Sequence, residues 1–256
     1  MNDHTTSVLR SQDGTISRIT LNRPEKRNAL NGELIAELTN AVRVSVDADE
    51  TRAIVISAAG PDFCSGADLA SLQKISEASV AENVDDARSL LNLFVLIRQV
   101  PLPVIAAVHG RALAGGCGLA TACDLVLASS SARFGYPEVK IGFVPAMVLA
   151  ILRRNVSEKH AFELLTRGRQ FGAQEAKELG LVNEVFGDET FAQEVIAYTK
   201  KFEGTSKSAV ALTKSLLYQV DGFAYLEALE TGADVNVIAR MTEDCQKGIT
   251  RFLGGK

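Results

Sequence analysis

Apolar residues between positions 104 and 128 gather in two short, unbroken runs, Val104–Val108 and Leu125–Ala128. Runs of this length without alternation predict strands that are buried on both faces. Between them, small residues lead from Ala114 to Gly118 and into a helix-like segment, Leu119–Cys123. Small side chains let the backbone approach a ligand closely, and free N–H groups at a helix start bind an oxygen that carries negative charge. The pattern predicts an oxyanion-binding helix start beside buried strands.

The chain before residue 104 alternates between strand and helix patterns. Val8–Leu9 and Ile16–Leu21 have the strand period on either side of the turn signal Asp13-Gly14, and Arg52–Ser57 forms a compact apolar strand. The first residues are expected to be frayed. Strands that alternate with helices predict an α/β fold with crossover connections. No G-x-G-x-x-G motif follows the first strand, which argues against a dinucleotide-binding fold.

Two amphipathic helices are predicted in this part of the chain. Asn31 is suited to cap a helix with an apolar face over residues 34–42. A second helix is predicted at Ala87–Val100, before Pro101, with an apolar stripe of Leu90, Leu91, Phe94, Ile97 and Val100. Residues 70–86 are polar, and they form either a mobile lid over a site or a helix exposed to solvent.

After residue 138 the helical pattern dominates. Ser157 is placed to cap a helix that ends near Arg167, and Ala173–Leu179 is predicted as a short helix; a glycine follows each. Leu181–Phe186 favours an extended segment, and helices continue to Phe252. The last third is therefore expected to be mostly helical.

Composition narrows the functional classes. A chain of 256 residues suits one large domain, or one domain with a small appendage, and its net charge of −4 argues against broad nucleic-acid binding. The four cysteines match no zinc spacing and the three histidines form no metal-ligating pair, so no metal or other cofactor is expected. Met1–Thr6 is polar and the apolar stretches are interrupted, which favours a cytoplasmic protein with reduced thiols and no membrane partner.

One carboxylate is a candidate acid/base. Glu138 lies twenty residues after Gly118 in a mostly apolar neighbourhood, where burial raises a carboxyl pKa toward the working range. A surface salt bridge with Lys140 is the alternative. The other polar candidates have structural interpretations that we prefer: Asp68 as a helix cap, Asp124 as a cap or a buried ion pair, and His109 as a hydrogen-bonded core histidine.

With these residues in view, the chain resembles the crotonase superfamily, also called the enoyl-CoA hydratase/isomerase family. The resemblance spans nearly the whole length, and the motifs together are specific for the fold and for CoA thioesters. The matching segments are Leu21-Asn22-Arg23-Pro24 with Asn28-Ala29-Leu30, Phe63-Cys64-Ser65-Gly66-Ala67-Asp68-Leu69, Ala112–Cys123, Pro137-Glu138 and Gly180-Leu181-Val182.

The resemblance implies a crotonase-like α/β fold. Residues 1–195 would form a spiral of β-β-α units that holds the CoA-binding and catalytic site, and residues 196–256 would form a helical oligomerisation region. Members of this family usually assemble as trimers or hexamers. Apolar side chains in the last third would need such a partner surface, among them Ile196, Phe202, Leu216, Leu217, Phe223 and Leu226.

The resemblance also implies the site residues. The N–H groups of Ala67 and Gly115, or Gly116 if the alignment slips by one residue, would form the oxyanion hole, with Glu138 as acid/base. The loop Lys26–Ala29, including Arg27, and the segment Cys64–Leu69, including Asp68, would hold CoA, which belongs to the substrate. A solvated loop is the alternative for Lys26 and Arg27. Phe252 would supply an adenine-side aromatic ring to a neighbouring subunit.

The sequence departs from the family pattern at three places. Typical hydratases have a glutamate where this chain has Gly118. Val144–Leu149 replaces a glycine-rich stretch, and Gly255 lies where a lysine is common. A single glutamate can move a proton between C2 and C4 of an enoyl-CoA, whereas hydration usually benefits from a second group that orients water. The departures leave hydration, isomerisation, thioester hydrolysis, another lyase reaction and a non-catalytic acyl-CoA-binding role open.

Overall fold

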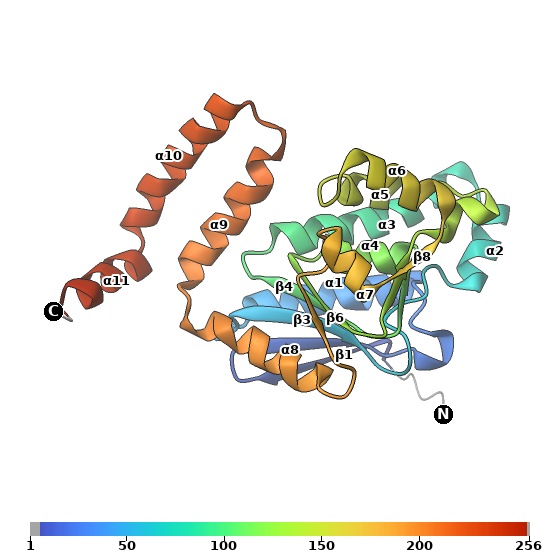
Figure 1. Cartoon of the computed structure of the whole chain (residues 1–256), viewed down its shortest axis with the longest axis horizontal. Helices are drawn as coiled ribbons and strands as arrows, with labels where there is room; N and C mark the ends of the chain where they lie inside the picture. The colour runs from blue at the N-terminus through green and yellow to red at the C-terminus, as the bar shows by residue number, and fades with distance from the viewer. Residues whose placement is uncertain (1–5, 255–256) are drawn as a thin grey trace.

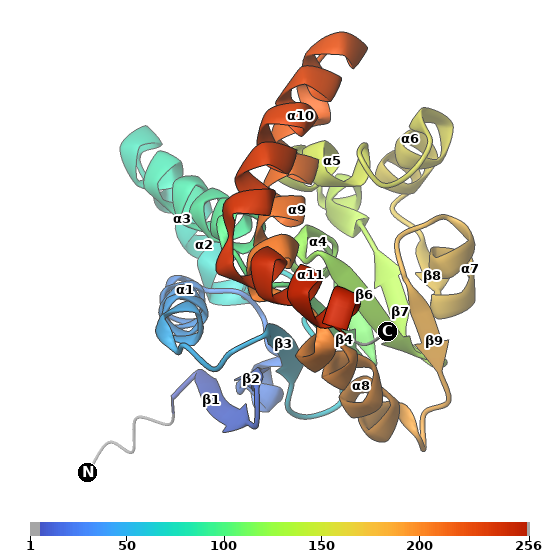
Figure 2. The ribbon, with the colours of Figure 1, turned by 90° about the vertical axis from the view of Figure 1, so that its left-hand side faces the viewer.

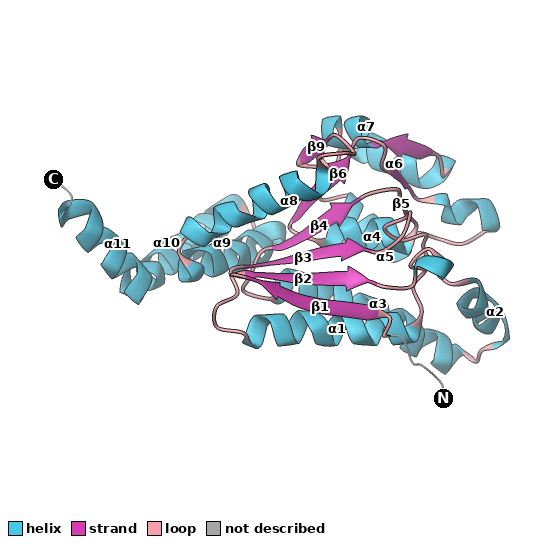
Figure 3. Cartoon of the chain, turned by 90° about the horizontal axis from the view of Figure 1, so that it is seen from below, coloured by secondary structure: helices cyan, strands magenta, loops and turns pink. Residues whose placement is uncertain are grey.

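The computed structural model describes residues 6–254 and contains a six-stranded sheet with helices on both faces (Figures 1 and 3). The strand order is β1-β2-β3-β4-β6-β9, in which only β1 and β2 are antiparallel. The strands are β1 (Val8–Asp13), β2 (Ile16–Leu21), β3 (Ala53–Ala58), β4 (Val104–Val108), β6 (Leu125–Ser129) and β9 (Glu184–Phe186). They confirm the predicted hairpin and buried strands. Residues 1–5, for which fraying is expected, and Gly255 lie outside the described residues.

Pairs of strands followed by a helix recur along the chain. β1 and β2 lead into α1 (Gly32–Asp47), and β4 and β5 (Arg111–Leu113) lead into α4 (Gly115–Ala122). β6 and β7 (Arg133–Gly135) lead into the 3-10 helix η2 (Pro137–Ile141) and α5 (Ala146–Leu152). β5, β7 and β8 (Gln170–Gly172) form a second small sheet. This repetition is the β-β-α spiral that the resemblance implies.

The main sheet has an apolar core on each face because successive side chains of a strand point to opposite sides. Ile54 and Ile56 of β3 belong to the larger core, together with residues of α1, α3 (Val80–Gln99) and α4. Ala53 and Val55 belong to a smaller core, which α8 (Phe191–Lys200) covers from the other side (Figure 3). Both faces of the central strands are thus removed from water, which explains their unbroken apolar runs.

Helix positions confirm part of the sequence interpretation and correct the rest. Asn31 caps α1, since its side chain accepts a hydrogen bond from the N–H of Leu34 at 2.9 Å. Residues 70–86 are helical except at Ala78 and Ser79, which separate α2 (Leu69–Glu77) from the first turns of α3. α3 begins at residue 80 instead of 87 because Ser79 and Glu82 form a capping box. The predicted stripe is wrong at Leu91, which is 45% exposed, whereas Leu93 is buried.

The later helices follow the cap signals. Ser157 accepts a hydrogen bond from the N–H of His160 at the start of α6 (Glu158–Arg167), and the left-handed Gly168 ends that helix. α7 (Ala173–Glu178) occupies the predicted short helix. The predicted extended segment at residues 181–186 is a strand only over its last three residues, in β9.

The C-terminal helices extend away from the core (Figure 2). They are α9 (Lys207–Gln219), α10 (Tyr225–Met241) and α11 (Glu243–Gly254), and neither α10 nor α11 contains a buried residue. Their exposed apolar side chains include Leu217, Leu226, Leu229, Met241 and Phe252. No helix among residues 6–254 is long and apolar enough to cross a membrane.

A buried ion pair attaches α9 to the core. The Lys214 ammonium donates to Asp124 Oδ2 at 2.6 Å and to the carbonyl oxygens of Ile97 and Leu102, each at 2.8 Å. The Tyr218 hydroxyl donates to the other oxygen of Asp124 at 2.7 Å. Asp124 directly follows α4 and its C-cap residue, and the predicted buried ion pair is confirmed there.

We expect Asp124→Ala to lower the free energy of unfolding by about 3–5 kcal/mol, because it leaves the ammonium of Lys214 buried without a counter-charge. Urea denaturation at a fixed protein concentration measures this loss. Glu243→Ala is the matched control, since it breaks the exposed Lys247–Glu243 pair on α11 and should cost less than about 0.5 kcal/mol. Equal losses in the two variants would contradict a special role for the buried pair.

Candidate active site

The start of α4 presents backbone N–H groups without a cap. Ala114, which precedes the helix, has φ 51° and ψ −126°, and no side chain accepts a hydrogen bond from the first turn. A non-glycine residue in this region stores about 1–3 kcal/mol of strain, which concentrates at functional sites. The first N–H groups of a helix have no intrahelical acceptor and carry partial positive charge. The predicted helix start is therefore present at Gly115, four residues before Leu119.

A second N–H group comes from the segment before α2. Leu30 donates to Gly66 O at 2.7 Å and accepts from the N–H of Asp68 at 2.9 Å. A parallel bridge of this kind turns the N–H of the middle residue, Ala67, away from Leu30. Gly66 has φ 101°, and a Cβ on it would lie 3.0 Å from the Cβ of Ala114. The segments that carry Ala67 and Gly115 therefore touch.

The two candidate glycines of α4 have different surroundings. A Cβ on Gly116 would lie 2.5 Å from the carbonyl oxygen of Cys64, so this glycine is required by packing. A Cβ on Gly115 would meet Leu30 Cδ1 at 3.1 Å and Leu90 Cδ2 at 3.8 Å. Gly115 is also the first residue of the helix, and we retain it as the candidate donor.

Glu138 is a half-buried carboxylate on η2. Its Oε2 atom is buried and has no hydrogen-bond partner within residues 6–254. Burial raises the pKa of Glu138 above its usual range, although its own backbone N–H partly offsets this effect. No ion pair joins it to Lys140 within those residues, so the salt-bridge alternative is wrong in this structure. A carboxyl group whose pKa is raised by burial, with no partner on Oε2, is a candidate for taking up and releasing a proton.

Apolar side chains occupy the place beside Gly118. A Cβ on Gly118 would lie 2.3 Å from Val148 Cγ1 and 3.3 Å from Phe94 Cζ. Both Val148 and Phe94 are buried. The chain thus has neither a carboxylate at position 118 nor the space for one there. Val148 fills that space, whereas the neighbouring Met147 is only partly buried.

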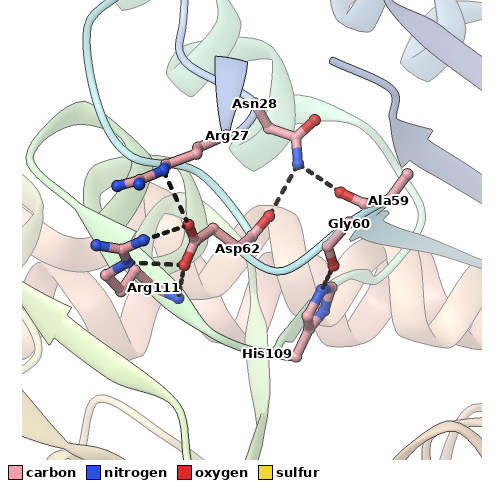
Figure 4. A network of polar contacts seen from close by, with 7 residues as sticks. All are labelled: Arg27, Asn28, Ala59, Gly60, Asp62, His109 and Arg111. Atoms are coloured by element: carbon pink, nitrogen blue, oxygen red, sulfur yellow. Dashed lines mark hydrogen bonds and ion pairs between the residues drawn. The ribbon is translucent and has the colours of Figure 1, made fainter. Parts of the chain in front are cut away.

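A network of ion pairs and hydrogen bonds joins the loops at residues 27–28, 59–62 and 109–111 (Figure 4). Asp62 is buried and accepts three hydrogen bonds from Arg111: from its backbone N–H at 3.0 Å, and from Nε and Nη2 at 2.8 Å each. Burial alone would raise the pKa of Asp62, but the hydrogen bonds and charge of Arg111 hold it below the usual range. Arg27 Nε lies 3.9 Å from the same carboxylate. Sequence analysis missed Asp62 and Arg111, which no local motif connects.

The same network holds neighbouring loops. The Asn28 side-chain amide donates to Ala59 O at 2.9 Å and to Asp62 O at 2.8 Å (Figure 4). His109 Nε2 is 2.8 Å from Gly60 O. The expected hydrogen-bonded state of His109 is confirmed, although the residue is half-buried and lies at the edge of the core. These contacts fix the segment that leads to Cys64.

The structure places the other predicted site residues in different environments. Lys26 is exposed, Ala29 and Cys64 are buried, and Leu69 begins α2. Burial raises the pKa of the Cys64 thiol to about 12, so a ligand would meet the backbone there and not a thiolate. Asp68 caps α2 and forms an ion pair with Arg23 Nη2 at 2.9 Å, which confirms the predicted cap.

Phe252 is not brought to this site within one chain. It lies on α11 and is 77% exposed, at the far end of the molecule from α2 (Figure 1). Its predicted contact with CoA therefore requires a neighbouring subunit.

Comparisons with known proteins agree with this geometry. The profile of a family described as enoyl-CoA hydratase/isomerase matches residues 11–255. A Thermus thermophilus protein with a provisional enoyl-CoA hydratase name is 40% identical over 246 residues, covering 96% of this chain and 97% of that protein. The 2,3-dehydroadipyl-CoA hydratase of Escherichia coli is 32% identical, with 96% and 95% covered.

Solved structures show the same architecture. An enoyl-CoA hydratase from Mycobacterium smegmatis superimposes with a TM-score of 0.92 at 32% identity, covering 98% of this chain and 97% of the other. Human enoyl-CoA hydratase domain-containing protein 3 gives a TM-score of 0.92 at 31% identity, with 98% of each chain covered. The expected crotonase fold is confirmed.

The contact between position 118 and Val148 can be tested by mutation. Gly118→Ala should lower the free energy of unfolding by about 1–3 kcal/mol, because the new methyl group overlaps Val148 Cγ1. In a Val148→Ala background the same change should be neutral or stabilising by up to about 1 kcal/mol, since alanine favours a helix over glycine. Chemical denaturation of the four proteins of this double-mutant cycle measures the coupling. An unchanged cost in the second background would contradict the contact.

Proposed function

The chain belongs to the enoyl-CoA hydratase/isomerase family, and we propose that it is an enzyme that acts on enoyl-CoA thioesters through an enolate, with Glu138 as its single acid/base. The observation that carries the proposal is the buried, unpartnered Oε2 atom of Glu138, in a chain that has no carboxylate at position 118. Burying a carboxylate that has no hydrogen-bond partner costs free energy and gives no structural benefit. We therefore assign this group a role in proton transfer.

The proposed chemistry begins with the thioester carbonyl. Removing a proton from C2 or C4, or adding water at C3, places negative charge on the carbonyl oxygen. The N–H groups of Ala67 and Gly115 would stabilise that charge, and in comparable sites the loss of one donor costs about 3–4 kcal/mol. Backbone donors on segments in close contact need no reorganisation as the charge develops.

The surroundings of Glu138 favour double-bond isomerisation. One carboxylate can remove a proton from one carbon of the enolate system and return it to another. Hydration also requires a water molecule to be oriented, and Val148 and Phe94 offer that water no hydrogen bond near Gly118. Hydration by Glu138 alone is the second candidate, supported by the hydratase names of the relatives. Thioester hydrolysis and another lyase reaction would also use Glu138 as acid/base and are further alternatives, whereas non-catalytic binding leaves the burial of Glu138 unexplained.

CoA is part of the substrate in this proposal, and no separate cofactor is required. Exposed Lys26 and the partly free Arg27 would meet phosphates, while the backbone of Cys64–Leu69 would hold the pantetheine arm. Residues 1–195 would hold this site, and residues 196–256 would form a homotrimer or hexamer interface that brings Phe252 to a neighbour. A cytoplasmic location belongs to the same proposal, and the four cysteines are free thiols.

Turnover of two substrates tests the function. We expect the protein to convert a 3-enoyl-CoA to the conjugated 2-enoyl-CoA faster than it hydrates crotonyl-CoA, with both reactions followed by ultraviolet absorbance. Faster hydration would replace isomerisation with single-glutamate hydration. Activity on neither substrate would reject the proposed function.

We expect Glu138→Gln to lower kcat by at least about 10²-fold while the affinity for a saturated acyl-CoA changes little, because the change keeps the shape and removes the base. In the wild type, activity should rise with pH through the raised pKa of Glu138, since the base must be ionised. Steady-state kinetics and calorimetric binding measure these effects. A variant that keeps half of the wild-type turnover would remove Glu138 from the mechanism.

The same variant should change the pH dependence of stability. Folding raises the pKa of Glu138, so the folded state binds more protons than the unfolded state between the unfolded value near 4.5 and the folded value. Stability from this group is thus lost as pH rises through that window. Glu138→Gln should melt at a higher temperature than the wild type above the window and at the same temperature below it. A constant difference at all pH values would contradict this assignment.

The C-terminal helices should mediate assembly. Leu226 and Met241 of α10 are 66% and 80% exposed in one chain, and we expect Leu226→Glu with Met241→Glu to shift a trimer or hexamer toward monomer. Sedimentation at micromolar concentration gives the molecular mass. Val44→Glu on α1, also at an exposed apolar residue, should leave assembly unchanged. A wild-type monomer would reject the proposed oligomer.

A further inference from the structure

A cleft of about 560 Å³ lies between α2, the first turns of α3 and the start of α1. Its polar lining residues are Ser71, Lys74 and Glu77 of α2, and Glu82, Asn83 and Asp86 of α3. The Asn83 amide donates to the carbonyl oxygens of Ile75 and Ala78, both at 3.4 Å, and so joins the two helices across the cleft. Glu138 does not line it, so the cleft is separate from the reacting carboxylate.

Two chain segments connect the cleft with the proposed oxyanion hole. Asp86 lies one helical turn, about 5 Å, before Leu90, and Leu90 is the side chain that packs beside Gly115. Gly32, another lining residue, follows Leu30 by two positions, and Leu30 also packs beside Gly115. An acyl chain of a few carbons that starts at the carbonyl would therefore reach the cleft.

The positions of the lining residues in the chain indicate which end of the substrate, CoA or the acyl group, the cleft would bind. The loop Lys26–Ala29, which the proposed function assigns to the CoA phosphates, precedes the bridge between Leu30 and Ala67, and the segment Cys64–Leu69, assigned to the pantetheine arm, spans it. The residues that line the cleft come after this bridge in both segments. None of the residues assigned to CoA lines the cleft, and we therefore assign the cleft to the acyl end of the thioester.

The lining is unsuited to a long alkyl chain. Lys74, Glu77, Glu82 and Asp86 form no ion pair with any residue in 6–254, so an alkyl chain would take unpaired charges out of water. The chain would also lose part of the burial energy of about 0.8 kcal/mol per CH₂ that an apolar tunnel provides. Three carboxylates face one ammonium, which disfavours a distal carboxylate and favours a group that donates hydrogen bonds.

We propose, on the basis of the proposed function, that this cleft selects acyl groups whose distal end is polar and uncharged or cationic, such as a hydroxyl or an ammonium group. Long alkyl chains and chains with a terminal carboxylate are discriminated against. This preference differs from that of the Escherichia coli relative, whose named substrate ends in a carboxylate.

Binding of four saturated esters tests the inference without relying on turnover. We expect calorimetry to rank affinity in the order 6-hydroxyhexanoyl-CoA, hexanoyl-CoA, decanoyl-CoA and adipyl-CoA, with about tenfold between the first and the last two. Equal or tighter binding of decanoyl-CoA or adipyl-CoA by the wild type would overturn the inference alone. Failure of all four esters to bind would overturn the proposed function as well, and with it the inference.

Variants locate the effect in the cleft. Glu77→Leu with Asp86→Leu should raise the affinity for decanoyl-CoA about tenfold relative to 6-hydroxyhexanoyl-CoA. Asp85→Leu is the matched control, because it makes the same change at the adjacent exposed residue of α3, which does not line the cleft. Glu77→Gln with Asp86→Asn, which keeps the side-chain shapes, should remove the discrimination against adipyl-CoA. A shift of the same size in the control, or none in the cleft variants, would contradict the assignment.

Discussion

The backbone of residues 64–67 touches the start of α4, and at two positions only a hydrogen atom fits between them. A Cβ on Gly116 would overlap the carbonyl oxygen of Cys64, and a Cβ on Gly66 would press on Ala114. The contact brings the N–H groups of two distant segments to one place and holds them there without any side chain. Strain at Ala114, with its positive φ, is the local cost of this arrangement. The rest of the site depends on it, because a donor that shifts by about 1 Å loses most of its stabilising effect on an oxyanion.

Glu138 has no partner for its buried Oε2 atom among the described residues, and no second carboxylate stands at position 118. Burial raises the pKa of Glu138, and no cation or donor among the described residues compensates for the burial of Oε2. A second carboxylate at position 118 would raise that pKa further by like-charge repulsion. Val148 and Phe94 occupy the space beside Gly118 instead, so the proposed mechanism relies on Glu138 as its single acid/base. The apolar substitution thus changes both the proton affinity of the site and its ability to hold water.

Local sequence patterns predicted those helices and strands whose formation depends on residues close together in the chain. The hairpin around Gly14, the caps at Asn31 and Ser157, and the buried central strands follow from turn chemistry and apolar runs. The small residues predicted a helix start in this region but not its first residue, because glycine disfavours a helix, and the close packing of Gly116 on Cys64 depends on tertiary structure. The early start of α3 was readable from the capping pair of Ser79 and Glu82.

Contacts between distant residues account for most of what the sequence did not predict. Asp62 and Arg111 are separated by 49 positions, and no periodicity relates them. The same holds for Val148 beside Gly118, which required knowing how α5 returns over α4. The resemblance to a family supplied candidate roles for Ala67, Gly115 and Glu138, and the structure supplies the surroundings in which those roles are physically reasonable.

α4 connects the proposed oxyanion hole with the C-terminal helices. Its first residue offers an N–H group to the site, and Asp124, two residues beyond its last turn, binds Lys214 and Tyr218 of α9. A buried ammonium that also satisfies the carbonyl oxygens of Ile97 and Leu102 fixes α9 against the end of α3 as well. The helix that carries the N–H donor is thus held at one end by Cys64 and at the other by α9. The end of α4 is thus joined to α9 by two hydrogen bonds to the charged carboxylate of Asp124.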